Sequence, residues 1–381
     1  MRFGKWKIMA LPLLVSSGVH AQSTVTMYGL IDEGLNFTNN AGTGQAYRLQ
    51  SGDVVGSRWG LKGSEDLGGG LAAIFRLENG FNASNGALQQ GGRLFGRQAY
   101  VGLASQNYGT LTAGRQYDPT VDLFSAITAA GNWGDVGATP FDNDNTDWDF
   151  RVNNSLKYVS PTIAGLTGEA MYGFSNTSGF ADNRLFSVAG QYQYGGLTAV
   201  AAYMRIDNPG SGTSGAVTND SVFSGAVQQN IDAGLAYKFK SVQVAFAWSH
   251  TSIDSPTGNA YLSGSIAPAN GGSWTNWKFD NFQINGQYFF TPAFWLGASY
   301  TYTMGKLDTT AGNYSPKWHT AQLTLDYDLS ARTSLYLQGA YQHVQSANTG
   351  TQFDNAQILA AAGPSSTVNQ FVYRIAMIHR F

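Results

Sequence analysis

Apolar and polar residues alternate strictly along much of the chain. The segment 322–329 is a clear example, with Leu and Tyr at its odd positions and Gln, Thr and Asp at its even positions. Because the side chains of a β-strand point alternately to its two faces, this segment is predicted to be a strand with one apolar and one polar side. A helix with this sequence would carry its charges all the way round.

Segments of this kind recur about sixteen times, and most are 10 to 13 residues long. Strands of globular proteins usually have about 5–6 residues, whereas a tilted membrane-spanning strand needs about 9–11. The pattern therefore predicts membrane-spanning strands. The predicted strands are 24–37, 53–66, 70–82, 93–104, 108–117, 151–160, 165–175, 184–194, 197–207, 228–239, 241–252, 278–290, 294–306, 317–329, 333–345 and 369–381.

The connections between these segments alternate between short and long. Tight turns such as 195–196 and 240–241 are followed by long polar loops. Transmembrane barrels have this asymmetry, with short periplasmic turns and long outer loops. We therefore predict an all-β, antiparallel transmembrane barrel of about sixteen strands, wide enough for an aqueous lumen. The long loops are predicted at 38–52, 82–92, 118–150, 175–183, 207–227, 253–277, 306–316 and 346–368.

The N-terminus carries a different signal. Arg2, Lys5 and Lys7 precede a short apolar run at 8–15, and small residues lead up to Ala21. This is the pattern of a secretory signal peptide, and the apolar run is too short for a spanning helix. We predict a signal peptide at 1–21 and a single barrel domain at 22–381.

Composition excludes several other classes. The chain has a net charge of −2 and no cysteine, so a nucleic-acid surface, disulfides and thiolate metal sites are not expected. The acidic run at 142–147 lacks the Gly and Glu of a calcium-binding EF-hand loop. No phosphate-binding loop or serine-hydrolase elbow is present. We therefore expect no cofactor, no metal and no enzymatic activity.

Several motifs resemble those of a known family. The runs 25–32, 56–68, 95–103 and 114–117, together with the C-terminal Phe381, are similar in order and spacing to the trimeric general-diffusion porins of Gram-negative bacteria, most of all to the beta-proteobacterial branch. The resemblance covers the whole predicted barrel domain. It implies an outer-membrane homotrimer in contact with lipid and lipopolysaccharide, with the third long loop, 118–150, folded into each barrel.

The resemblance also implies a pore constriction, in which basic wall residues face acids on the inserted loop. The best basic matches are Arg58, Arg97 and Arg151, and weaker candidates are Arg115 and Lys62. The loop offers Asp135, Asp142, Asp144, Asp147 and Asp149, and which of them face the lumen is left open. Arg stays charged when crowded, so a weak anion preference is expected. The family further implies that Phe381 is a signal read by the barrel assembly machinery.

Three alternatives stay open. A solute-selective channel would need an aromatic track along the lumen, whereas the predicted lumen faces carry mostly Gln, Asn, Ser and Thr. A barrel enzyme such as a lipase or protease would need a Ser, His and acid set at the membrane edge. An adhesive role of the loops is compatible with passive diffusion of ions and small hydrophilic solutes through the pore.

Overall fold

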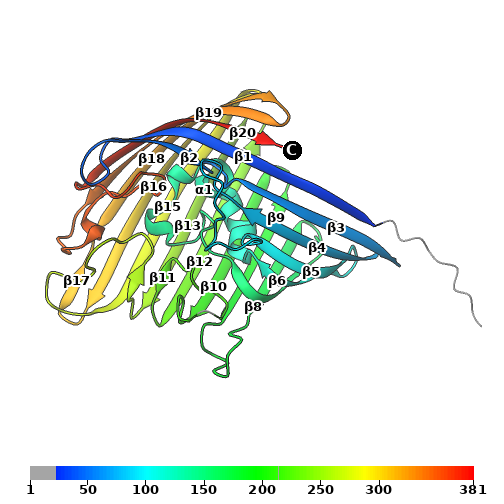
Figure 1. The fold of residues 1–381 in the computed structure, drawn as a ribbon, viewed down its shortest axis with the longest axis horizontal. Helices are drawn as coiled ribbons and strands as arrows, with labels where there is room; N and C mark the ends of the chain where they lie inside the picture. Colours follow the sequence, from blue (N-terminus) through cyan, green and yellow to red (C-terminus); the bar gives the residue numbers. More distant parts are fainter. Residues whose placement is uncertain (1–22, 213) are drawn as a thin grey trace, which may run out of the picture.

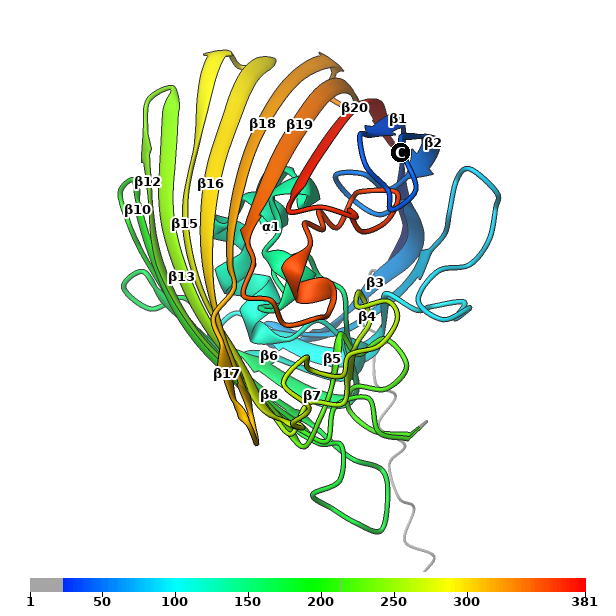
Figure 2. The same cartoon turned by 90° about the vertical axis from the view of Figure 1, so that its left-hand side faces the viewer.

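The structure is a computed structural model that describes residues 23–212 and 214–381. The predicted signal peptide at 1–21 lies outside the described residues. Antiparallel strands wrap around a central space and close on themselves (Figures 1 and 2). Closure is made by β1 (Thr24–Thr38) and β20 (Asn369–Arg380), which pair from Leu30 with Arg380 to Thr38 with Val372.

The predicted number of strands is confirmed. Two short strands, β2 (Ala46–Ser51) and β3 (Arg58–Gly68), pair with successive halves of β1 and together act as one of sixteen barrel strands. The other barrel strands are β4 (Leu71–Gly80), β5 (Gln98–Ser105), β6 (Gly109–Gln116), β7 (Val152–Val159), β8 (Leu166–Gly173), β9 (Leu185–Tyr194), β10 (Leu197–Asp207), β12 (Val227–Phe239), β13 (Val242–Asp254), β15 (Trp274–Thr291), β16 (Phe294–Thr309), β18 (Lys317–Ser330) and β19 (Thr333–Gln345). Three short strands, β11 (Phe223–Ser224), β14 (Gly258–Asn259) and β17 (Gly312–Tyr314), lie in or beside the long loops.

The predicted bounds were wrong in several regions. The expected strand 93–104 begins only at Gln98, and the expected loop 306–316 contains the last residues of β16 and all of β17. A further difference adjoins β1. The expected loop 38–52 contains β2, and the expected strand 53–66 begins only at Arg58. The reason lies in β1, where the carboxylate of Asp32 accepts hydrogen bonds from the backbone N–H groups of Val54 (2.7 Å) and Val55 (3.0 Å). These donors are therefore drawn out of the strand ladder, and the segment 52–57 folds toward the lumen.

The outer face of the barrel is apolar, as the alternation predicted. Along β18, Leu323, Tyr327 and Leu329 are at least half exposed, whereas Gln322 and Thr324 are buried inside the barrel. A barrel in a bilayer presents such an apolar band to lipid and satisfies all its backbone hydrogen bonds by closure. No helix in the described ranges is long and apolar enough to cross a membrane.

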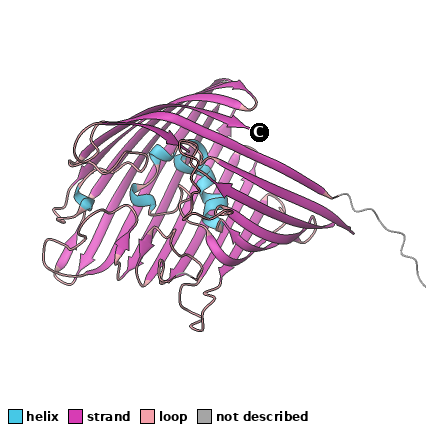
Figure 3. Ribbon diagram, viewed as in Figure 1, coloured by secondary structure: helices cyan, strands magenta, loops and turns pink. Residues whose placement is uncertain are grey.

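The loop between β6 and β7, termed loop 3, folds into the barrel interior (Figures 2 and 3). It consists of short helical turns: a π-turn η1 (Thr120–Phe124), 3₁₀ turns η2 (Ser125–Ile127), η3 (Asp135–Gly137) and η4 (Pro140–Asp142), and the helix α1 (Ala129–Trp133). Lumen-facing amides hold its backbone: Gln283 accepts from Ala129 N (2.7 Å), and Gln338 donates to Trp133 O (2.9 Å). The predicted inward position of this loop is confirmed.

An aromatic core fills part of the lumen, which the alternation did not predict. Phe141 of loop 3 packs edge-on against Trp318 of β18 (5.8 Å between ring centroids) and against Phe353 of the loop 346–368 (5.2 Å). Phe279 and Trp277 of β15 join the same buried cluster. The outer ends of β10 to β19 thus face other protein groups rather than water, and we call this cluster the aromatic core.

Candidate pore constriction

A polar cavity of about 160 Å³ lies between loop 3 and the opposite wall of the barrel. It is lined by three arginines, which lie at the start of β3 (Arg58), just before β5 (Arg97) and just before β7 (Arg151), and by three aspartates of loop 3. The segment 52–57 and the β4–β5 loop complete the lining. The lining residues are Gly52, Val54, Val55, Gly56, Arg58, Gln89, Gln90, Arg97, Ala130, Asp135, Asp147, Trp148, Asp149 and Arg151.

Tyr117 organises the arginines. It follows β6 directly, is buried, and its hydroxyl oxygen accepts hydrogen bonds from Arg97 Nη2 (2.6 Å) and Arg151 Nη2 (2.8 Å). The guanidinium carbon of Arg151 lies 4.9 Å from the ring centroid, within the range of a cation–π contact. Arg58 Nη2 and Arg151 Nε are buried and have no hydrogen-bond partner among the described residues.

One wall carboxylate balances part of this positive charge. Glu78 of β4 is buried and accepts from Arg97 Nε (2.9 Å) and Arg76 Nη2 (2.6 Å), while Arg58 Nη1 lies 4.0 Å from it. The hydroxyl of Tyr28 donates to the same carboxylate (2.8 Å). Because one carboxylate serves three guanidinium groups, the wall keeps an excess of positive charge.

The loop acids carry less charge than their number suggests. Burial raises the pKa of Asp147 well above its usual range, and the neighbouring acids Asp135, Asp142 and Asp149 raise it further. Burial also raises the pKa of Asp149, against the opposing effect of the Tyr261 hydroxyl, which donates to its carboxylate. Carboxyl groups with raised pKa values are more readily protonated, whereas guanidinium groups remain charged.

Two of the predicted basic residues lie away from the cavity. Arg115 bonds to the carboxylate of Asp220 (2.5 Å) and to Gly96 O (2.7 Å), and so connects the wall to the loop 208–226. Lys62 is exposed and lies closer than Arg58 to the periplasmic end of β3. Its Nζ atom is 5.5 Å from the ring centroid of Tyr28. Neither residue lines the cavity.

Two of the predicted acids are structural parts of loop 3. The carboxylate of Asp142 accepts from the backbone N–H of Asp147 (2.9 Å). Asp144 accepts from the hydroxyls of Thr139 and Thr146 (both 2.8 Å) and of Ser249 on β13 (2.6 Å). Both are at most 2% exposed and do not line the cavity, in contrast to Asp135.

Sequence reasoning did not identify Tyr117, Glu78 or Arg374 as parts of this region. Tyr117 ends a family-like motif at 114–117, which was a usable signal. Glu78 lies on the polar face of β4, so the alternation predicts that it faces the lumen. The alternation does not predict that arginines from other segments lie beside it. Arg374 is described below.

Comparisons with known proteins agree with this architecture. A family model described as Gram-negative porin matches residues 8–347. An outer membrane porin protein of Bordetella pertussis is 31% identical over 375 residues, which cover 88% of this chain and 94% of that protein.

Solved structures show the same fold. An anion-selective porin from Comamonas acidovorans has a TM-score of 0.70 at 21% identity, over 94% of this chain and all of that one. The trimer form of the outer membrane protein OmpT of Vibrio cholerae has a TM-score of 0.66 at 17% identity, over 94% of this chain and 99% of that one. The closed barrel is thus shared with these solved structures, and the family model and the Bordetella relative show that the chain belongs to the Gram-negative porin family of outer-membrane channels.

Proposed function

We propose that this outer-membrane diffusion channel prefers anions, and that its selectivity is set at the cavity between loop 3 and the wall. The observation that carries the proposal is that Arg58, Arg97 and Arg151 all line this cavity, with Arg97 and Arg151 held together by the Tyr117 hydroxyl. Selectivity in a pore depends on its diameter and on the charged groups at its narrowest part. The anion selectivity named for the Comamonas structure supports the same direction.

The sign of the preference follows from the protonation of the two sides. The three arginines remain charged at every relevant pH, whereas burial favours the neutral form of Asp147 and Asp149. The local potential is therefore positive although the chain has a net charge of −2. Arg115, Lys62, Asp142 and Asp144 have structural or peripheral roles in this proposal, because none of them lines the cavity.

The proposal extends to assembly. We infer a homotrimer, in line with the trimer form of the Vibrio cholerae protein, inserted among lipid and lipopolysaccharide by the barrel assembly machinery. Phe381 supports a role of the C-terminus, because its backbone N–H and C=O groups bond to Gly29 O (3.0 Å) and Gly29 N (3.1 Å). These bonds extend the seam between the last strand and β1, so deletion of Phe381 is expected to lower the amount of assembled protein in the outer membrane. Undiminished levels would contradict this role.

Current through single channels in a planar bilayer tests the channel proposal. With a potassium chloride gradient, the zero-current potential should have the sign of anion preference, and openings should come in threes. Arg58→Gln should lower the anion-over-cation permeability ratio more than Lys62→Gln, which removes one positive charge from the same strand outside the cavity. Cation preference in the unmodified protein would refute the proposed selectivity, and a non-conducting folded protein would point to a plugged barrel.

A further inference from the structure

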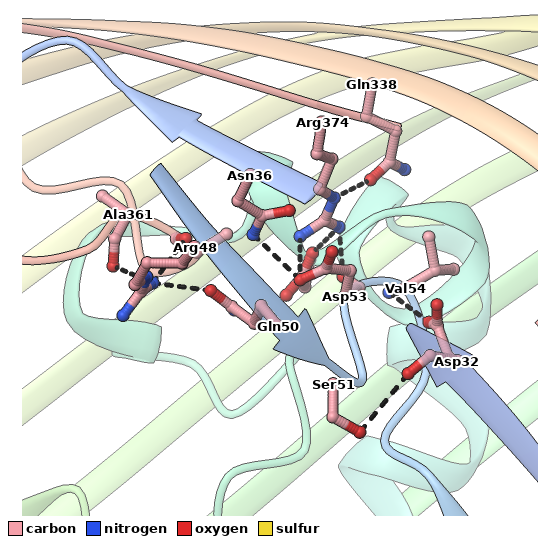
Figure 4. Close-up of polar contacts among 12 residues, drawn as sticks. Asp32, Asn36, Arg48, Gln50, Ser51, Asp53, Val54, Gln338, Ala361 and Arg374 are labelled. Atoms are coloured by element: carbon pink, nitrogen blue, oxygen red, sulfur yellow. Dashed lines mark hydrogen bonds and ion pairs between the residues drawn. The ribbon is translucent and has the colours of Figure 1, made fainter. Parts of the chain in front are cut away.

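A buried ionic cluster lies directly behind the constriction, where the closing strands of the barrel meet loop 3 (Figure 4). Its centre is Arg374 of β20, whose side chain has no exposed surface. The Nε atom of Arg374 donates to Gln338 Oε1 (2.7 Å), its Nη1 atom lies 3.3 Å from Asp53 Oδ1, and its Nη2 atom bonds to the carboxylate of Asp135.

The two aspartates belong to different elements that border the cavity. Asp135 begins the turn η3 in loop 3 and lines the cavity itself. Asp53 lies in the segment 52–57, whose residues Gly52, Val54, Val55 and Gly56 also line the cavity. Arg374 is not part of the lining. One guanidinium group behind the wall therefore connects two elements that border the channel.

Neighbouring contacts make this connection rigid. Gln338 of β19 binds Arg374 and also donates to Trp133 O in α1 (2.9 Å). Asp32 of β1 binds the backbone of the segment 52–57 and accepts from the hydroxyl of Tyr336 (2.7 Å). The Nη2 atom of Arg374 also donates to the backbone oxygen of Asp53. A planar guanidinium can hold several acceptors in fixed directions, which a lysine ammonium on a flexible stem cannot.

We propose that Arg374 is a positioning and specificity-determining residue of the channel, although it does not touch the solute path. It holds loop 3 against the segment 52–57, and its positive charge, which Asp53 shares, offsets the negative charge of Asp135 at the cavity. The arginines on the opposite wall then determine the ion preference. The inference deepens the proposed function and rests on it, since it names the residue that keeps one acid of the constriction from opposing the arginines.

Zero-current potentials of matched variants at about pH 8 test this role, because an unpaired carboxyl is ionised there. Arg374→Gln should lower the anion-over-cation permeability ratio about two-fold or more relative to Arg380→Gln. Arg380 is the matched control, since it lies six residues further along the same strand and therefore on the same face, but is exposed at the periplasmic end. Adding Asp135→Asn to Arg374→Gln should restore the ratio, because it removes the unpaired carboxylate that lines the cavity, whereas Asp53, the other partner of Arg374, does not line it.

The opposite results would overturn the inference. Equal ratios for Arg374→Gln and Arg380→Gln, or a double variant whose ratio stays low, would show that Arg374 does not act through Asp135. If Arg374→Gln does not fold, Arg374→Lys decides: it should keep the ratio but increase open-channel noise, and a quiet channel would contradict the positioning role. Cation preference of the unmodified protein would refute the proposed anion selectivity rather than the role of Arg374. The difference in permeability ratio between Arg374→Gln and Arg380→Gln would still test that role.

Discussion

The two sides of the barrel interior are built from opposite chemistry. On the side of β3 to β7, arginines that bond to Glu78 and Tyr117 border a polar cavity. On the side of β10 to β19, the outer ends of the strands carry Trp277, Phe279 and Trp318, which are covered by loops and by Phe141 of loop 3. Loop 3 lies between the two sides and contributes acids to one and an aromatic ring to the other.

This difference shows how one lumen can be both a packed core and a channel. The aromatic core buries rings that contact one another edge-on, and such burial stabilises folded proteins. The cavity side instead gathers guanidinium groups beside Tyr117 and Glu78, where their charge is available to act on solutes. We expect substitutions in the aromatic core to change stability, and substitutions at the cavity to change ion preference. Three predictions test this division.

The largest expected effect is on the aromatic-core side. Phe353→Ala should lower the free energy of unfolding by about 3–5 kcal/mol, because the ring of Phe353 is fully buried and contacts Phe141 and Trp277. Urea unfolding in lipid vesicles measures the loss. Phe246→Ala on the lipid face is the control, and its loss should be clearly smaller, since this side chain is 49% exposed. Similar losses for the two variants would mean that the loops are only loosely packed in the lumen.

A pair of loop 3 variants should separate the two roles within one segment. Asp144→Ala should cost about 1.5–3 kcal/mol, because it removes the charged acceptor that connects loop 3 to Ser249. Its permeability ratio should stay unchanged, since Asp144 does not line the cavity. Asp147→Asn, measured at about pH 8, should do the reverse: it should raise the anion preference by removing the negative charge that Asp147 carries there, with little change in unfolding. If Asp144→Ala changed the ion preference and Asp147→Asn did not, loop 3 could not be divided into acids that hold the loop and acids that act on ions.

The smallest expected effect is the pH dependence of selectivity. Burial raises the pKa of Asp147 and of Asp149, so both take up protons at a higher pH than ordinary carboxyl groups. Lowering the pH from about 8 to about 5 should therefore increase the anion-over-cation permeability ratio while the arginines stay charged. Because the raised pKa favours the protonated folded state, these groups should also add stability as the pH falls. A permeability ratio that does not change between about pH 8 and about pH 5 would contradict the role given to these two acids. So would a change that is as large in Asp147→Asn as in the unmodified protein.

Only part of the constriction could be predicted from the sequence. Motif positions identified Arg58, Arg97 and Arg151, and the structure brings these three to the cavity. Five loop acids were equivalent in the sequence, since their orientation depends on the turns of loop 3. Arg374 could not be linked to Asp53 and Asp135, because the three residues are far apart in the chain and meet only when the barrel closes.

The sequence by itself determined the strands, their facing and the closed barrel. Alternation with a period of two is a local property, and a shift of one residue would turn every apolar side chain from lipid to lumen, so the register is strongly constrained. The tertiary structure alone decided how the lumen is filled. Loop 3, the aromatic core and the cluster around Arg374 depend on contacts between distant segments, and the parity of a strand residue shows that it faces inward but not whether it meets water, a ring or a charge.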